Sequence, residues 1–512
     1  MMGVKQKEQK LFYNFSLLSR IPKDHFLRKL DESVDFGFIY NLAKPYYSYT
    51  GQPGIDPVVL LKMMLIGYLY NITSERKLAQ ELSVNLAFMY FLGYDIDEET
   101  PNHSVLSKAR RRFGNRIFER FFEIVVEKCK EHGLIQAEKA FVDSTLIPAN
   151  ASLSSIVDCD EKIVLRRSPK EYLKVVDELN PVESEDKKEQ MEEKPKLQTN
   201  QVSYSKTDPE ASIVKHHNKS PQLAYKQHIS VDNGPARIIT ACVTTPAAVA
   251  DEHKLPYLIS KADETHNILP KEVGADTKYG TADNYRFLLE SQMKPSISHH
   301  GGKNATGLLT KDNFIYDREK DQYTCPQGKI LENSGFSKQQ RHYVYRTNPK
   351  ACKACKFLKE CTNSPRGRSI TRHINESFLE QAKEHLKTPQ AKVTINQRGE
   401  YVENVFACEK KDLGLNKAKF RGLIPVHIQS LLTATAYNLK KLVKYSKGFK
   451  EKLKTAIDLP ILPLAEANMS QLRQKFADSR LVCAVSSFRN SVFSFLNHIF
   501  GLFGLRLTYN VT

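Results

Sequence analysis

The chain has 512 residues, too many for one ordinary hydrophobic core, so about two to four domains are expected. Its 76 lysines and arginines exceed its 58 aspartates and glutamates, which gives a formal net charge of +18. A surplus of this size favours a polyanionic partner, with nucleic acid first and an anionic membrane second. The most apolar early stretch, Pro57 to Tyr70, contains Lys62 and is too short to span a bilayer, so we expect no membrane partner.

The cysteine content and the N-terminus indicate the compartment. Nine cysteines, an odd number in a large chain, argue against a disulfide framework and for a reducing environment. The first ten residues, MMGVKQKEQK, have neither the apolar region nor the cleavage site of a secretory signal. The apolar run from Val492 to Leu505 contains Asn497 and His498, which suits a packed helix better than a membrane span. We therefore expect a cytoplasmic protein.

Residues 1–135 have the pattern of short helices joined by tight turns. One apolar helix covers Ile55–Tyr70, a second follows a cap at Thr73 or Ser74, and a third runs from Asn102 to Phe121. The third helix is basic on its other sides, at Lys108, Arg110, Arg111, Arg112, Arg116 and Arg120. This pattern is typical of a helix-turn-helix-like unit, in which Arg110, Arg111 and Arg112 would contact DNA. A solvated basic face on a helical bundle is the alternative.

From residue 136 to 299 the pattern changes to strands. The expected strands are short and either apolar or alternating: Ala140–Asp143, Tyr225–Asp232, Arg237–Thr245 and Glu272–Asp276. The turn Asp232-Asn233-Gly234-Pro235 joins the second and third as a hairpin. The first and the last end on an acid, and a helix over Leu255–Ala262 lies between the hairpin and the last strand. A hairpin followed by alternating helices and strands predicts a mixed α/β sheet.

Two insertions interrupt this part of the chain. Residues 181–210 have almost no apolar side chains and are predicted to be disordered. Residues 300–375 contain four of the nine cysteines. Residues 376–450 return to helix, with a long apolar helix from Ile424 to Leu439, and residues 451–512 form a tail region without an assigned role. We find no internal repeat and no GxxxxGK[ST] loop, which excludes the nucleotide-driven classes.

Three acids have the order that a metal-dependent phosphodiesterase needs. Cleavage by a metal-activated water uses two divalent ions about 4 Å apart, bound by carboxylates that converge from separate elements. The candidates are Asp143 in AFVDSTLIPA, Asp276 in VGADTKYGT and Glu403 in QRGEYVENVFACEKK. Each alone is more often a cap or a solvated turn residue. All three in order, in a basic chain with a helical N-terminal part, favour a Mg²⁺ or Mn²⁺ site.

At these residues the chain resembles the DDE transposases of bacterial insertion sequences, specifically those with a helical N-terminal domain and a cysteine-bearing insertion. The resemblance covers about residues 35 to 445. It rests on these segments in order: TSERKLAQEL, NHSVLSKARRRF, AFVDST, YKQHISVD, VGADTKYGT, YVENVF and FRGLIPVHIQSLLTATAYNL. One departure is Ala407, where the family usually has glycine after the phenylalanine; it bears on local helix packing more than on chemistry.

The resemblance implies an RNase H-like mixed sheet with helices in 136–299 and 376–450, preceded by an all-helical DNA-binding domain and interrupted by the insertions. It implies that Asp143, Asp276 and Glu403 are catalytic, and that Arg398 and Lys410 contact DNA ends. The implied reaction is hydrolytic nicking at the ends of an insertion sequence, followed by attack of the freed 3′-OH on target DNA. The implied partners are terminal inverted repeats, target DNA and further copies of the chain.

Two other functions stay open. The first is a catalytically inactive DNA-binding regulator derived from a transposase, and the presence of all three acids argues against it. The second is an RNase H-like nuclease, which would share the metal site and lack strand transfer.

Four cysteines lie in the insertion, at Cys325, Cys352, Cys355 and Cys361. The CxxC spacing suits tetrahedral Zn²⁺, whose structural sites close with four ligands. The wide gap between Cys325 and Cys352 matches no well-known zinc ribbon, and free thiols are the main alternative. The surrounding lysines and arginines favour a small module near DNA phosphates.

Further polar residues near the acids are less informative. His228 lies in an alternating strand, and we expect it to be hydrogen-bonded and partly buried. Asp251 precedes a helix and is expected to cap it. Lys278 and Tyr279 follow Asp276 closely, and either contact with DNA or plain surface exposure would explain them.

Overall fold

The computed structural model describes residues 16–48, 50, 54–158, 203–215, 220–299, 307–338, 341–364 and 366–457, with side chains up to residue 445. The chain divides into two compact units, Met1–Ser446 and Lys447–Thr512. Every element below lies in the first unit, apart from the end of the last helix. In the described part of the chain no helix is long and apolar enough to cross a membrane.

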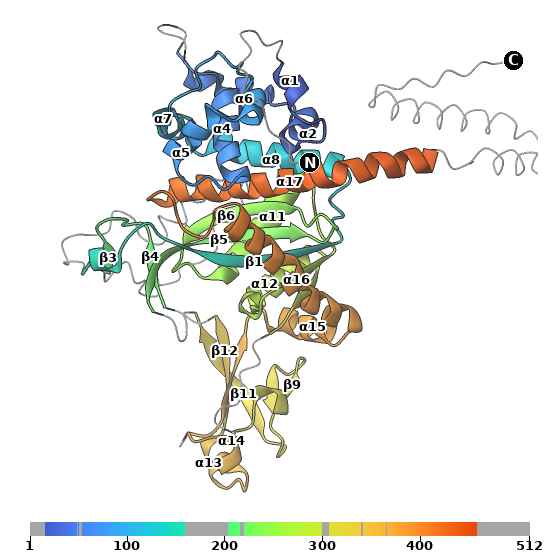
Figure 1. Ribbon diagram of the computed structural model, residues 1–512. Helices are drawn as coiled ribbons and strands as arrows, with labels where there is room; N and C mark the ends of the chain where they lie inside the picture. Colours follow the sequence, from blue (N-terminus) through green and yellow to red (C-terminus); the bar gives the residue numbers. More distant parts are fainter. Residues whose placement is uncertain are drawn as a thin grey trace, which may run out of the picture. The chain divides into compact units, whose positions relative to one another are not determined.

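The N-terminal helices, called the head from here on, come before the sheet in the chain (Figure 1). Their bounds are α1 Leu17–Arg20, α2 Phe26–Ser33, α3 Phe38–Ala43, η1 Lys44–Tyr46, α4 Pro57–Leu69, α5 Glu75–Leu82, α6 Leu86–Leu92, α7 Ser104–Phe113 and α8 Arg116–Glu131. Ser74 caps α5 as expected, because its side chain accepts a bond from the Lys77 amide at 3.3 Å. Helix α4 is apolar on every side because it is the central, buried helix of the head.

The expected single basic helix from Asn102 to Phe121 is wrong. Gly114 has φ +61° and ψ −155°, a backbone conformation that L side chains rarely adopt, and it separates α7 from α8. Helix α8 then buries an apolar face into the core shared by the head and the sheet. Arg120 lies on α8 and pairs with Glu123 and Glu127, so it does not extend the basic face of α7.

The central sheet is mixed, as predicted. Its strands are β1 Lys139–Pro148, β4 Ser212–Val214, β5 Gln222–Asp232, β6 Ile239–Pro246, β7 Glu272–Ala275 and β8 Lys294–Ile297. The order is β6-β5-β1-β7-β8. Strand β4 also pairs with β5, at Gln222–Ala224, before the part of β5 that pairs with β6. The β6-β5-β1 pairs are antiparallel, and the β1-β7-β8 pairs are parallel. This order and these directions are those of the RNase H-like fold.

The first strand is longer than the sequence predicted. We expected it to end at Asp143, but β1 continues for five more residues to Pro148. The reason is its pairing with β5, which extends from Ala140 opposite Asp232 to Pro148 opposite Ala224. The β5–β6 hairpin is confirmed. The Asp232 carboxylate accepts a bond from the Gly234 amide in the turn and from the amides of Gln136 and Ala137, which precede β1.

Helices cover the sheet on both faces. Their bounds are η4 Asp251–Lys254, α11 Leu255–His266, η5 Thr277–Tyr279, α12 Ala282–Glu290, α15 Glu376–Leu386, α16 Pro389–Asp412 and α17 Leu423–Ile457. Helix α16 crosses one face over β8, β7 and β1, and α11 contacts β6 and β5 (Figure 1). The expected helices over Leu255–Ala262 and Ile424–Leu439 are therefore confirmed.

The polar insertion predicted at 181–210 is only partly described. Residues 181–202 lie outside the described residues. Residues 203–210 contradict the prediction of disorder, because β3 (Ser203–Ser205) pairs with β2 (Ile156–Asp158). Strand β2 directly follows the short helix η2 (Leu153–Ser155). Asp208 is 1% exposed and accepts bonds from the Tyr225 hydroxyl at 2.7 Å and the Gly422 amide at 3.1 Å. Strand pairing and a buried carboxylate order this segment without apolar side chains.

The cysteine-bearing insertion is a separate antiparallel sheet with the order β13-β12-β11-β10-β9. Its elements are η6 Lys311–Asn313, β9 Ile315–Asp317, β10 Gln322–Thr324, β11 Ile330–Ser337, β12 His342–Thr347, α13 Pro349–Lys353, α14 Leu358–Cys361 and β13 Ser369–His373. It has its own small core, made of Phe314, Tyr323, Leu331, Tyr345 and Ile370.

A buried carboxyl group lies where α16 covers β5. Glu409 is fully buried, and its Oε1 accepts a bond from Gln227 Nε2 at 3.1 Å. Within the described structure, Glu409 Oε2 and Gln227 Oε1 have no hydrogen-bond partner. Burial raises the pKa of Glu409 to about 8, although the Gln227 bond and the Lys410 charge lower it in part. The protonated carboxyl can donate where the ionised one cannot.

Replacing Glu409 with Gln should flatten the pH dependence of stability. The folded pKa of about 8 lies above the ordinary value of 4.5, so the stabilisation from the protonated form is complete below pH 4.5 and is lost as the pH rises to 8. Thermal melts across this range should show the wild-type Tm falling relative to that of Glu409→Gln. Parallel pH profiles for the two proteins would show that Glu409 is not the titrating group.

Candidate active site

Asp143 lies on β1, and Asp276 directly follows the last residue of the adjacent parallel strand β7, which ends one residue before the position that the sequence predicted. Val142 of β1 is level with Ala275 of β7, so the two acids occupy the next matching positions. Alternate side chains of a strand share a face. Phe141, two residues before Asp143, stacks on Tyr401 of α16 with 4.8 Å between ring centroids. Both acids therefore belong to the sheet face that α16 covers.

Gly274 allows α16 to pack closely against β1 and β7. It lies two residues before Asp276, and a Cβ built on it would meet the Phe141 ring at 2.9 Å and Thr394 of α16 at 3.3 Å. A larger residue at 274 would push the ring or the helix away. Glycine at this position lets α16 approach β7 beside the acid.

A backbone amide of the following residue orients each aspartate, and Arg398 also pairs with Asp143. The Ser144 amide donates to Asp143 Oδ1 at 2.7 Å, and the Thr277 amide donates to Asp276 Oδ1 at 2.8 Å. Arg398 of α16 reaches across to Asp143 Oδ2 at 2.5 Å. These contacts set the direction of both carboxylates before any ligand binds.

The charge on Asp143 is poorly balanced. Burial raises its pKa to about 6, and the negative charges of Asp276 and Asp251 add to the rise. The Arg398 guanidinium and the Ser144 amide lower the pKa, and they offset only part of the effect. An added cation beside Asp143 would favour the ionised form.

Glu403 lies on α16 with an exposed side chain. Tyr401, two residues earlier, points toward the start of β1, where its hydroxyl donates to the Asn233 carbonyl at 2.9 Å. Two residues rotate an α-helix by about 200°. Glu403 is therefore on the edge of α16 opposite to Tyr401. Across the described ranges, no group of three or more His, Cys, Asp or Glu side chains has the spacing to hold a metal ion.

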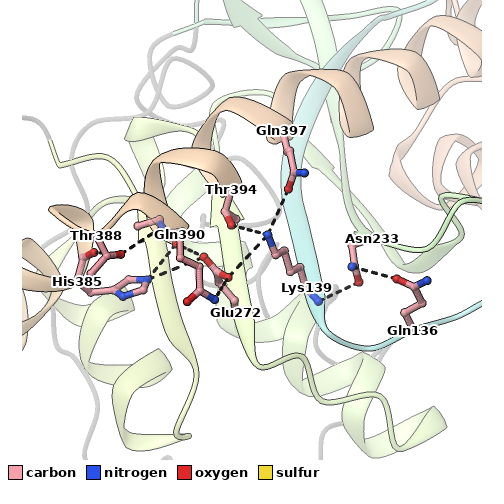
Figure 2. A network of polar contacts seen from close by, with 11 residues as sticks. Gln136, Lys139, Asn233, Glu272, His385, Thr388, Gln390, Thr394 and Gln397 are labelled. Carbon is pink, nitrogen blue, oxygen red and sulfur yellow. Dashed lines mark hydrogen bonds and ion pairs between the residues drawn. The ribbon is translucent and has the colours of Figure 1, made fainter.

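A polar network fastens the first half of α16 to the sheet (Figure 2). Lys139 Nζ donates to Thr394 Oγ1 at 2.8 Å and to Gln397 Oε1 at 3.2 Å, and it lies 4.0 Å from Glu272 Oε2. Gln390 Nε2 donates to Glu272 Oε2 at 3.0 Å. Lys139 begins β1 and Glu272 begins β7, so one network holds both acid-bearing strands to the helix that carries Glu403.

A second polar cluster lies on the other face of the sheet, directly behind Asp143. Ser144 points to this face, and its hydroxyl donates to Asp251 Oδ1 at 3.0 Å. Lys226 of β5 is 2.9 Å from the same oxygen, and Lys278 is 3.7 Å from Oδ2. The expected N-cap role of Asp251 is wrong, because its carboxylate caps neither η4 nor α11. The Lys226 ammonium binds it instead.

This cluster was missed in the sequence. The available signal was the spacing of Lys226 and His228, alternate residues of one strand that place polar groups on one face. His228 is buried as expected, with its Nε2 2.8 Å from Thr245 Oγ1. Burial lowers its pKa to about 3, so the ring is neutral. Tyr279 is buried, whereas the Lys278 side chain is 59% exposed.

The three consecutive arginines of α7 have different surroundings. Arg110 forms an ion pair with Glu75 and lies over the Phe420 ring at 4.2 Å, and its side chain is 12% exposed. Arg111 and Arg112 are exposed, and Arg112 lies 5.2 Å from the centroid of Tyr47. Arg110 thus connects the head to the segment before α17, and the exposed cations are Arg111 and Arg112.

The four cysteines of the insertion line one cavity of about 210 Å³. They are Cys325, Cys352, Cys355 and Cys361, all with free thiols and all partly exposed. They share this cavity, but among the described residues no group of three or more His, Cys, Asp or Glu side chains has the spacing to hold a metal ion.

Two transposase family models match the chain. A transposase domain, DUF772, matches residues 15–112, which cover most of the head. A transposase DDE domain matches residues 324–443, which include Arg398, Glu403 and Lys410. None of the curated proteins matches the chain.

One solved structure is similar over most of its length, a cryo-EM structure of the piggyBac transposase synaptic complex with hairpin DNA. It is 10% identical, with 88% of this chain and 83% of that chain covered and a TM-score of 0.31. A TM-score this low carries no argument, so the fold rests on the strand order above. The transposase domain at the head and the transposase DDE domain across the insertion and α16 together support a DDE transposase of the insertion-sequence type.

Proposed function

We propose that this transposase cleaves DNA at the ends of an insertion sequence and joins the freed 3′ ends to target DNA. Asp143, Asp276 and Glu403 would hold the divalent metal, Mg²⁺ or Mn²⁺. The observation that supports this most is the matching register of Asp143 and Asp276 on adjacent parallel strands beneath α16. Carboxylate oxygens are the ligands these ions prefer, and the bound ions would activate the attacking hydroxyl and stabilise the leaving oxygen.

Glu403 supplies the carboxylate oxygens that a divalent metal prefers, but it is not clustered with Asp143 and Asp276. Glu403 has an exposed side chain on α16 and is therefore able to change rotamer. The rigid parts of the site are the two aspartates, which backbone amides orient. We infer that Glu403 joins them when metal and DNA are bound.

Arg398 and Lys410 are the proposed contacts to DNA ends. Arg398 lies beside Asp143, so its guanidinium is next to the place where a scissile phosphate would meet the carboxylates. Lys410 follows about three turns later on the same helix. A DNA end along α16 could therefore meet both cations, and assembly of two ends would require more than one copy of the chain.

Asp251 is proposed as a positioning residue. It contacts Ser144, whose amide orients Asp143, and it pairs with Lys278, two residues after Asp276. One buried carboxylate thus supports the segments that carry both aspartates from the opposite face of the sheet.

Removing a catalytic acid should abolish chemistry and leave DNA binding nearly unchanged. In Asp143→Asn, Asp276→Asn and Glu403→Gln, nicking and strand transfer should fall by about 100-fold or more, since each change removes a metal ligand. The control is Glu400→Gln, an exposed acid one turn before Glu403 that should keep activity. The assay uses DNA bearing the flanking terminal repeats with Mg²⁺ or Mn²⁺. Wild-type rates in the acid variants would refute the site, and nicking without strand transfer in the wild type would indicate a nuclease.

The two exposed arginines and Arg110 should behave differently. The double variant Arg111→Ala/Arg112→Ala should weaken DNA binding and reduce its salt dependence by up to about two phosphate contacts, with an unchanged Tm. Arg110→Ala should instead lower stability by about 1–3 kcal/mol, because it leaves the partly buried Glu75 without its partner. Anisotropy titrations over a salt series and thermal melts measure both. An unchanged salt dependence in the double variant would remove α7 from the DNA interface.

A double-mutant cycle tests the Asp251 cluster. Asp251→Asn should destabilise the chain by about 3 kcal/mol, because it leaves the Lys226 charge unbalanced inside the protein. The double variant Lys226→Met/Asp251→Asn should recover most of that loss. The metal concentration for half-maximal nicking should be higher than in the wild type in both Asp251→Asn and the double variant, because both lack the Asp251 carboxylate behind Ser144. If the loss in the double variant equals the sum of the losses in Asp251→Asn and Lys226→Met alone, the two residues are not coupled.

A further inference from the structure

The cysteine-bearing insertion has too little core to hold all of its parts. Its described residues run from 307 to 373, and five side chains form its buried core. Helices α13 and α14 have no buried residue. Modules below about 70–80 residues usually need a disulfide, a metal or a partner in addition to their apolar core. The segment that carries α13 and α14 needs such a fastening.

The four thiols surround the space beneath these two helices. The cavity of about 210 Å³ is lined by Cys325 from the sheet side and by Cys352, Cys355 and Cys361 from the helical segment. One cavity thus collects a ligand from the sheet and three from the segment to be held.

The turn at Cys325 has the geometry of a metal-binding loop. Cys325 N donates to the Lys329 carbonyl at 2.8 Å, and Gly328 N donates to the Cys325 carbonyl at 2.8 Å. Gly328 has φ +73°, which allows this tight turn. The Lys329 amide then points at Cys325 Sγ at 3.2 Å. A backbone N–H directed at sulfur stabilises the thiolate, the form that binds metals.

The other side of the cavity is similarly built around its sulfurs. Cys355 N donates to the Cys352 carbonyl at 3.0 Å, which turns the CxxC segment toward the cavity. Gly367 has φ +85°, and a Cβ built on it would lie 3.2 Å from Cys352 Sγ. Arg368 holds the Cys361 carbonyl at 2.9 Å and the Leu309 carbonyl at 2.8 Å. A cation beside the thiols would also offset the negative charge of four thiolates.

We propose that Cys325, Cys352, Cys355 and Cys361 bind one structural Zn²⁺ that fastens α13 and α14 to the sheet of the insertion. Four thiolates complete a tetrahedral zinc site and leave no open position for catalysis. The four sulfurs line one cavity without being at ligand spacing, so zinc binding would draw them together and order the segment. The proposal is independent of the carboxylate site.

The test is the metal content of the full-length protein, purified in reducing buffer without chelator. The wild type should hold one zinc per chain, and Cys325→Ser and Cys355→Ser should each lose it. Cys408→Ser is the matched control, since Cys408 is also a partly buried free thiol but lies on α16. Cobalt in place of zinc should give the sulfur-to-metal absorption of a tetrahedral thiolate site in the wild type and the control. Chelation should also speed proteolysis within 341–368.

Each contrary result overturns the proposal. A wild type that holds no zinc and gives no cobalt spectrum has free thiols. Retention of zinc by both serine variants places the ion elsewhere, and disulfides between these cysteines under native conditions replace the metal with redox chemistry. Should the serine variants be insoluble, Cys355→His keeps a zinc ligand at this position and should restore both solubility and zinc.

Discussion

The attachment of α16 to the starts of β1 and β7 is the contact on which the candidate site depends. Two strands bring Asp143 and Asp276 together, but the third carboxylate, Glu403, lies on this helix, as do Arg398 and Lys410. The Lys139–Glu272 network holds its first half, and the Phe141–Tyr401 stack holds its middle. A half-buried lysine and a buried glutamate are costly alone, and each is satisfied here by the other and by amide and hydroxyl groups of α16. The network therefore fixes where along the sheet the helix lies.

The electrostatics of the two sheet faces differ. Behind the sheet, Asp251 is paired with Lys226 and Lys278, so its charge is balanced. Burial acts to raise the pKa of Asp251, but the Lys226 ammonium and the Ser144 hydroxyl lower it below its ordinary value overall. In front, Asp143 has the Arg398 guanidinium beside it, and the negative charges of Asp276 and of Asp251 behind the sheet both act on it. A balanced carboxylate serves as a support, and an unbalanced one is suited to binding a cation. The charge environment therefore suits Asp251 to a supporting role and Asp143 to cation binding.

Much of this could be predicted from the sequence, because the relevant patterns are local. The strand-end acids, the Asn-Gly hairpin and the Ser74 cap all depend on a few consecutive residues. The errors concern longer-range effects. The length of β1 is set by its partner strand, and the role of Asp251 is set by a lysine 25 positions away in the chain. The order in 203–210 comes from pairing with β2 and from Tyr225, neither of which composition reveals. Arg110 looked like its neighbours until Glu75 and Phe420 were placed beside it.

The distance along the chain between the parts of the site also has a kinetic consequence. Lys139 and Thr394, like Asp143 and Arg398, are 255 residues apart, and the whole insertion lies between them. Contacts of such separation close large loops and form late in folding. On a ribosome, the head and both aspartates emerge well before α16 does. A nascent chain could therefore engage DNA through its head before it possesses a complete cutting centre, so that binding precedes competence during synthesis.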